Sequence, residues 1–194
     1  MVYPAQRGDA NPSKCWNWFR SADQRRDEGE PSLIAGITRQ VMQDYSGDPE
    51  RVFVAGLSAG GAAAAIMGAT YSDLYAAVGI HSGLAYGAAT DMASAFAAMR
   101  QGGGASRHAV PGGPTIPAII FHGDRDTTVH PDNGAPAIEQ VIGSYGAHML
   151  WHRWRSPWHI HRLARPNHCS CGRDSSGIDP SQSGRMGENE CWYG

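Results

Sequence analysis

The sequence predicts an α/β fold in which a parallel sheet carries helices on both faces. Three apolar runs typical of buried strands, residues 51–57, 76–80 and 115–121, alternate with segments of helical periodicity. Parallel strands read as continuous apolar runs because helices cover both of their faces. With 194 residues and 41% hydrophobic content, the chain is long enough to bury one such core.

The helices between these strands have signals of their own. Pro31 suits the first position of a helix that keeps apolar residues at helical spacing as far as Tyr45. A second helix follows the first strand and is expected to run to about Tyr71. Residues 91–99 predict a third helix, after which a glycine-rich segment connects to the last strand.

The pentapeptide Gly-Leu-Ser-Ala-Gly at residues 56–60 joins the first strand directly to the second helix. This is the setting of a nucleophile elbow, a tight turn that holds a serine hydroxyl where a base can reach it. We expect the two flanking glycines because the turn leaves no room for a Cβ against the strand and the helix. Ser58 is therefore the predicted nucleophile, and a purely structural turn is the alternative.

Two aspartates follow the last predicted strand. In the α/β-hydrolase order of serine, acid and histidine, the acid lies on a loop after a late strand, so Asp126 is the predicted acid. The alternative is that both aspartates cap a turn or helix, which is our expectation for Asp124. His122 precedes the acid and is expected to pack locally, and His81 is expected to be a structural residue near the site.

Charge and hydropathy exclude several classes of partner. The formal net charge is −2, and no basic stripe occurs before the last fifty residues, so we expect no nucleic-acid partner. No apolar run is long enough to span a membrane, and none has the form of a signal peptide. Residues 1–4 look like the end of a strand that runs into a loop.

Several motifs together resemble the poly(3-hydroxybutyrate) depolymerase family of α/β-hydrolase esterases. They are Tyr-Pro-Ala-Gln at 3–6, Cys-Trp-Asn-Trp-Phe at 15–19, residues 29–34, the glycine-flanked serine with Gly60 and Gly61, residues 75–83, and His-Gly-Asp-Arg-Asp at 122–126. The resemblance implies a secreted or envelope serine esterase that needs no cofactor and cleaves polyhydroxyalkanoates or related short-acid esters. Feruloyl and acetyl-xylan esterases are relatives, so their activities are an alternative.

The resemblance also assigns roles to residues. It makes Ser58 the nucleophile, Asp126 the acid and the backbone N–H of Ala59 one oxyanion donor. It places Trp16 and Trp18 along the acyl or polymer-binding cleft, with a packed loop cover as the alternative. A second oxyanion donor is expected on a loop that would precede residue 1, and the family pattern pairs the cysteine at residue 15 with that segment.

The family pattern also requires a histidine loop after the acid, and the sequence changes character there. We expect residues 1–147 to form a partial α/β-hydrolase domain, incomplete at both ends. Residues 148–194 form an atypical tail without helical or strand periodicity, which we expect to be out-of-frame translation or disordered. Codons for residues 159–165 can be chosen so that a one-base shift reads Tyr-Thr-Val-Trp-Arg-Asp, which resembles the strand before that loop.

The tail offers substitutes for the missing parts, but the sequence fixes none of them. Any histidine after the acid satisfies the order, and the candidates are His148, His152, His159, His161 and His168. A Cys3His zinc site could use His168, Cys169, Cys171 and Cys191, but the spacing of these cysteines departs from the usual two-residue gap, so no metal is expected. A catalytically dead fragment of the family is the alternative to an enzyme, and the oligomeric state stays open.

Overall fold

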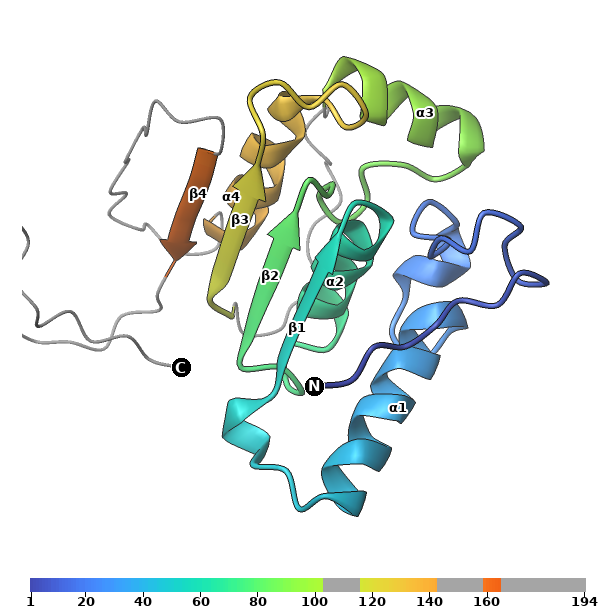
Figure 1. Ribbon diagram of the computed structural model, residues 1–194, viewed down its shortest axis with the longest axis vertical. Coiled ribbons are helices and arrows are strands. Elements are labelled where there is room, and N and C mark those ends of the chain that lie inside the picture. The colour runs from blue at the N-terminus through green and yellow to red at the C-terminus, as the bar shows by residue number, and fades with distance from the viewer. Residues whose placement is uncertain (103–115, 143–158, 165–194) are drawn as a thin grey trace, which may run out of the picture.

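A computed structural model of the protein describes residues 1–102, 116–142 and 159–164. The strands are β1 (Phe53–Leu57), β2 (Ala77–His81), β3 (Ala118–His122) and β4 (His159–Ala164). The helices are α1 (Gly29–Asp44), α2 (Ala59–Thr70), α3 (Met92–Gln101) and α4 (Gly134–Ile142), with short 3-10 turns at Ser21–Gln24, Pro49–Arg51 and Pro131–Asn133. Figure 1 shows the four strands side by side in the order β1-β2-β3-β4.

The sheet confirms the predicted α/β fold. β1, β2 and β3 are parallel, with α2 as the crossover between the first two strands. Their carboxyl ends are in register, because Leu57 is paired with His81 and His81 with Phe121. Side chains and loops that follow these three strands therefore meet at one edge of the sheet.

Strand β4 was not expected from the sequence. It lies in the segment where we predicted neither helical nor strand periodicity, and it pairs antiparallel with β3, where His122 is opposite His159. Without it, β3 would present an unpaired row of backbone N–H and C=O groups. An unpaired strand edge can bind a neighbouring segment through backbone hydrogen bonds. These bonds depend less on the side-chain pattern of that segment than burial in a core does.

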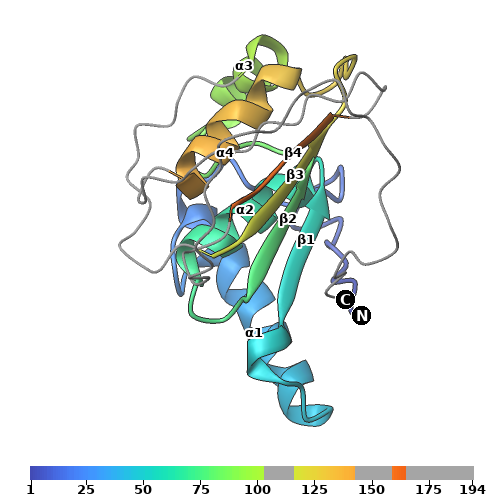
Figure 2. The same cartoon turned by 90° about the vertical axis from the view of Figure 1, so that its left-hand side faces the viewer.

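All four helices lie on one side of the sheet, as Figure 2 shows, and α2 and α4 contact its strands directly. On that face lie Val54, Val78, Ile80, Ala118 and Ile120. Ala137 and Ile138 of α4 pack against the same cluster, while Ile34 and Ala35 of α1 pack on α2.

The second face of the sheet carries no helix among the described residues, although the sequence predicts helices on both faces. Phe53 and Leu57 of β1 point there with 59% and 62% of their surface exposed. Both residues belong to the apolar run that predicts a strand buried on two sides. The apolar pattern is therefore present on this face, but the described chain does not cover it.

The N-terminal residues do not form a strand. Met1, Val2 and Tyr3 are exposed, and β1 is hydrogen-bonded to β2 alone within the described sheet. Residues 1–4 therefore do not pair with β1.

Helix boundaries follow the predictions within two residues, with one omission. α1 begins at Gly29 rather than at Pro31, and α3 begins after Asp91, whose carboxylate accepts a hydrogen bond from the N–H of Ser94 at 2.8 Å. The sequence reasoning named no helix over α4, which packs over β3.

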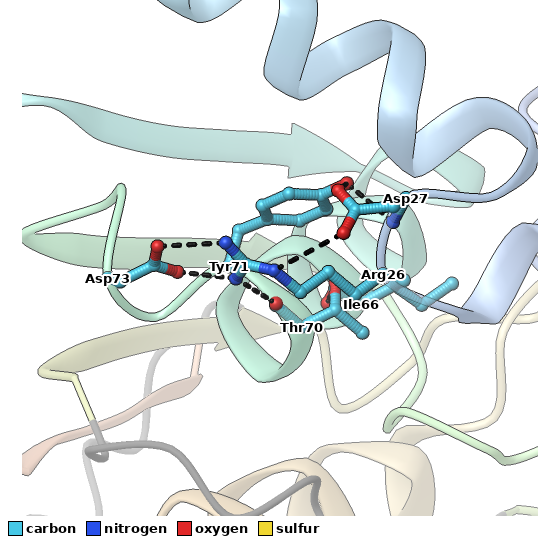
Figure 3. Close-up of polar contacts among 6 residues, drawn as sticks. All are labelled: Arg26, Asp27, Ile66, Thr70, Tyr71 and Asp73. Atoms are coloured by element: carbon cyan, nitrogen blue, oxygen red, sulfur yellow. Dashed lines mark hydrogen bonds and ion pairs between the residues drawn. The ribbon is translucent and has the colours of Figure 1, made fainter.

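A clamp of polar residues joins the loop before α1 to the end of α2 (Figure 3). The Arg26 guanidinium donates to both carboxylate oxygens of Asp73 at 2.6 and 2.9 Å and to the carbonyl oxygen of Thr70 at 2.9 Å. It also lies 4.5 Å from the ring centroid of Tyr71. The Tyr71 hydroxyl, fully buried, accepts from the Asp27 N–H at 2.8 Å and donates to its carboxylate at 3.1 Å.

Candidate active site

Ser58 occupies the turn between β1 and α2 in a strained conformation. Its φ of 54° and ψ of −119° lie outside the regions that non-glycine residues normally adopt. Such a conformation costs about 1 to 3 kcal/mol, so the surrounding structure must enforce it. The Ser58 N–H donates to the carbonyl oxygen of His81 at 2.9 Å, and its side chain is half-buried. The hydroxyl is held at the carboxyl edge of the sheet.

The glycines around this turn have unequal roles. A Cβ on Gly56 would overlap the carbonyl group of Gly60, so the turn excludes any other residue there. A Cβ on Gly61 would lie 2.9 Å from the His81 carbonyl oxygen and 3.0 Å from that of Gly56. A Cβ on Gly60 would meet nothing within 4 Å. The expectation that both flanking glycines lack room is therefore wrong for Gly60, and the second crowded position is Gly61.

Ala59 is the first residue of α2, directly after Ser58. The first N–H groups of a helix have no acceptor within the helix, because the partner residue would precede the helix. The helix dipole adds positive potential at the same end. The intrahelical bonding of α2 instead begins with Ala62, whose N–H donates to the Ser58 carbonyl oxygen at 3.0 Å. The Ala59 N–H is therefore one of the groups at the N-terminus of α2 that have no acceptor within the helix.

Asp126 lies on the loop after β3. Its Oδ1 accepts hydrogen bonds from the N–H groups of Thr128 and Val129, both at 2.9 Å, and its carboxylate is also bonded by the side chain of Ser82. Burial acts to raise the pKa of Asp126, but these donors outweigh burial and hold the pKa below its ordinary value. Asp126 is therefore anionic at neutral pH, and it also caps its own loop.

Ser58 and Asp126 lie at the same edge of the sheet. Ser58 follows β1 and Asp126 follows β3, so one strand separates them, which is two strand spacings or about 10 Å between backbones. Residues of β2 and its following loop occupy the space between them. Ser82 is the residue of this edge that sequence reasoning missed, although its place directly after an apolar strand was a usable signal.

His122 is buried beside the acid. Its Nε2 lies 2.8 Å from the carbonyl oxygen of Val129, so Nε2 carries the proton and donates it. The same nitrogen is 3.7 Å from Asp126 Oδ2, too far for a hydrogen bond, and among the described residues Nδ1 has no hydrogen-bond partner. His122 thus packs and bonds locally, as expected. His81, half-buried, places its ring edge-on to Phe121 with 6.1 Å between centroids.

The structure describes the backbone of two of the five tail histidines. His159 and His161 lie on β4, and three strand spacings, about 14 Å, separate that strand from β1. The other three candidates, His148, His152 and His168, lie outside the described residues, as do the three cysteines of the zinc hypothesis. In the described part of the chain, no three side chains gather as metal ligands would.

The two tryptophans predicted to line a cleft differ in position. Trp18 is 6% exposed and packs in the core with Phe19, Leu84 and Val129. Trp16 is half-buried against the cluster that contains Ile34 of α1. These contacts are those of a packed loop cover, the alternative role for both residues. The neighbouring Cys15 is exposed with a free thiol.

A half-buried carboxylate holds this loop in place. Glu30 of α1 accepts from the backbone and side-chain N–H groups of Asn17, both at 2.6 Å, and from the Gln6 amide. Burial raises the pKa of Glu30, although the Asn17 donors act in the opposite direction. The groups that donate to Glu30 are all amides, which do not act as catalytic acids. The network therefore positions the loop and adds no catalytic acid to the site.

Comparisons with known proteins agree with this architecture. The model of the family described as esterase PHB depolymerase matches residues 1–148. Poly(3-hydroxyalkanoate) depolymerase C of Paucimonas lemoignei is 37% identical over 75% of this chain and 38% of its own length. A probable acetylxylan esterase A of Neosartorya fischeri is 30% identical over 68% of this chain and 40% of its own length. The chain thus spans about two fifths of these relatives.

Among solved structures, the acetyl xylan esterase of Aspergillus awamori has a similar fold. The TM-score is 0.58 at 24% sequence identity, and the match covers 67% of this chain and 54% of that chain. At this identity the likeness supports the fold alone. None of the helices in the described ranges is both long and apolar enough to cross a membrane.

Proposed function

Because the chain belongs to the esterase PHB depolymerase family, we propose that it is a serine hydrolase that cleaves carboxylic esters through an acyl-enzyme. The observation that carries the proposal is the conformation of Ser58. A serine forced into a strained turn between a parallel strand and a helix N-terminus is the arrangement of a nucleophile elbow. The chain spans only part of its relatives, so the activity is proposed for the protein to which this sequence belongs.

The proposed mechanism uses three groups of the described edge. A base removes the proton of the Ser58 hydroxyl, and the oxygen attacks the ester carbonyl. The Ala59 N–H donates to the oxyanion of the tetrahedral intermediate. The base returns the proton to the departing alcohol, and water then releases the acyl group from Ser58 by the same steps. Asp126 orients the base and stabilises its protonated form. No cofactor takes part.

The base is a histidine that follows Asp126 in the chain. The tail candidates are His148, His152, His159, His161 and His168, of which His159 and His161 lie on β4. The alternative is that residues 148–194 are read out of frame and replace the histidine loop of the family. Sequencing the coding DNA through codon 148 separates the two, because an intact single frame overturns the frameshift hypothesis.

The proposed substrate is a polyhydroxyalkanoate or a related short-acid ester, and the proposed location is extracellular or in the cell envelope. The relative of higher identity is a depolymerase named for poly(3-hydroxyalkanoate), which favours this class. Similarity to an acetylxylan esterase favours a second candidate, an esterase of the acetyl-xylan or feruloyl kind. Turnover of hydroxybutyrate oligomers, acetyl-xylan and feruloyl esters by the same preparation ranks the candidates.

A fluorophosphonate probe tests the proposal. We expect covalent labelling of the purified chain at Ser58 and no labelling of Ser58→Ala. Ser72→Ala is the control, because Ser72 lies beyond the far end of α2 and should leave labelling unchanged. A folded, soluble chain that does not react would instead favour a catalytically dead fragment of the family. Circular dichroism and a cooperative thermal transition establish that the sample is folded.

A further inference from the structure

Ser82 directly follows β2, between the turn of Ser58 and the loop of Asp126. The carbonyl oxygen of the preceding residue, His81, accepts the Ser58 N–H at 2.9 Å. The Ser82 N–H donates to the carbonyl oxygen of Phe121 at 2.8 Å, and its side chain bonds to the Asp126 carboxylate. Two consecutive residues therefore connect the Ser58 turn to the loop that carries Asp126.

The backbone of Ser82 is strained for a serine. Its φ is 45°, in the left-handed region that glycine adopts without strain. The residue is also buried, with 8% of its surface exposed. Strained, buried positions of this kind cluster at functional sites, where a side chain has a role that outweighs the strain. The only polar group that a serine adds over glycine here is the hydroxyl.

The hydroxyl is held at a fixed place. A Cβ on the next residue, Gly83, would lie 2.7 Å from the Ile80 side chain and 2.8 Å from the backbone of Gly61. The segment after β2 is thus packed directly against the start of α2. Burial limits the rotation of the Ser82 side chain.

The N–H groups that donate to Asp126 from its own loop do not fix the position of its carboxylate relative to the sheet. Oδ1 accepts from Thr128 and Val129, which belong to the same loop and move with it. His122 comes no closer than 3.7 Å to Oδ2 and already donates to a carbonyl group. Ser82 belongs to a different strand, and its hydroxyl ties the carboxylate to the segment that also holds the Ser58 turn.

We propose that Ser82 is a positioning residue for the acid, whose hydroxyl holds the Asp126 carboxylate where a histidine shared with Ser58 can meet it. The proposal rests on the proposed function, because that function makes Asp126 the acid. Ser82 acts through Asp126 and does not touch the ester. Its loss therefore slows the reaction of Ser58 and shifts the titration of Asp126 without changing substrate affinity.

The test uses Ser82→Gly in the full chain. Glycine removes the hydroxyl and relieves the strained φ, so the variant should fold at least as well as the parent. Ser46→Gly is the matched control, because Ser46 has a φ of 52° on an exposed turn after α1. Both variants should keep or raise the thermal midpoint, and only Ser82→Gly should affect the site. Two readouts are followed: the rate of fluorophosphonate labelling against pH, and the titration of the Asp126 carboxyl carbon by NMR, assigned with Asp126→Asn.

In Ser82→Gly we expect the pKa of Asp126 to rise. The acid limb of the pH profile of labelling should move to higher pH with it, and the labelling rate should fall roughly tenfold. Ser46→Gly should match the parent in all three. An unchanged titration and labelling rate in folded Ser82→Gly overturns the proposal. If the parent chain itself does not react, the proposed function fails, whereas the carboxyl titration still decides whether Ser82 holds Asp126.

Discussion

Ser58 and His81 are joined through their backbones: the N–H of the serine donates to the carbonyl oxygen of the histidine at 2.9 Å. The bond extends the β1–β2 ladder by one residue into the turn, beyond the pair formed by Leu57 and His81. The position of the serine is therefore set by the central strand of the sheet as well as by its own turn. Substitutions that disturb this contact should change both stability and reactivity.

Gly56→Ala should disrupt the serine turn, whereas Gly60→Ala should be tolerated. A Cβ at residue 56 overlaps the Gly60 carbonyl group, which is backbone and cannot move aside, so we expect a loss of at least about 2 kcal/mol of unfolding free energy. A Cβ at residue 60 has open space, and alanine there should be neutral or stabilise by about 0.4 to 1 kcal/mol. Urea unfolding of both variants measures the difference. Equal effects would contradict the close approach of residues 56 and 60 in this turn.

The Tyr71 hydroxyl should contribute to stability through the Asp27 loop. Tyr71→Phe keeps the buried ring and removes the group that accepts from the Asp27 N–H at 2.8 Å. We expect a loss of about 1 kcal/mol, the usual net value of one hydrogen bond. Tyr45→Phe is the control, because Tyr45 is 80% exposed and should lose nothing measurable. A Tyr71→Phe protein as stable as the parent would contradict the clamp of Figure 3.

Glu30 should make stability depend on pH. Burial raises its pKa in the folded protein, so the folded state binds this proton more tightly than the unfolded state does. Its contribution is present below the ordinary glutamate pKa and is lost as pH rises through the raised folded value. The unfolding free energy of the parent minus that of Glu30→Gln should therefore fall as pH rises above the ordinary glutamate pKa of about 4.3. Glu28→Gln, at a half-exposed side chain, is the control. A difference independent of pH would refute the burial of this carboxylate.

Asp126 should make the unfolding free energy depend on pH in the opposite direction to Glu30. Burial works to raise its pKa, but the N–H groups of Val129 and Thr128 and the Ser82 hydroxyl lower it overall. A depressed folded pKa gives stability that is present above the unfolded value, about 3.9, and lost as pH falls through the folded value. The unfolding free energy of the parent should therefore exceed that of Asp126→Asn most at neutral pH, and the two values should approach each other near pH 2. Asp124→Asn, on the exposed side of the same loop, is the comparison.

The same Asp126→Asn variant has an expected catalytic effect. Asparagine keeps the size of the side chain but cannot stabilise a protonated base, so labelling of Ser58 should fall by roughly 10³ to 10⁴. Loss of rate with an intact fold would separate the catalytic role of Asp126 from its capping of the loop. A labelling rate within a factor of about three of the parent would exclude the acid role.

The sequence by itself determined the three parallel strands and most of the helices. Continuous apolar runs with helices between them leave few arrangements besides a parallel sheet, and Ser58 and Asp126 follow two such runs. The tight strand-to-helix turn was also readable, because a glycine-flanked serine between these elements is a local pattern. Local patterns are readable from sequence since they depend on neighbours along the chain.

The tertiary structure decided what depends on residues far apart. It paired β4 with the open edge of β3, left Phe53 on an uncovered face and buried Trp18 in the core. It also showed that Gly61 rather than Gly60 is crowded, and that Ser82 contacts the acid loop. Each of these contacts depends on which strands and loops lie side by side in the sheet. Packing across the sheet sets that arrangement, and the spacing of residues along the chain does not encode it.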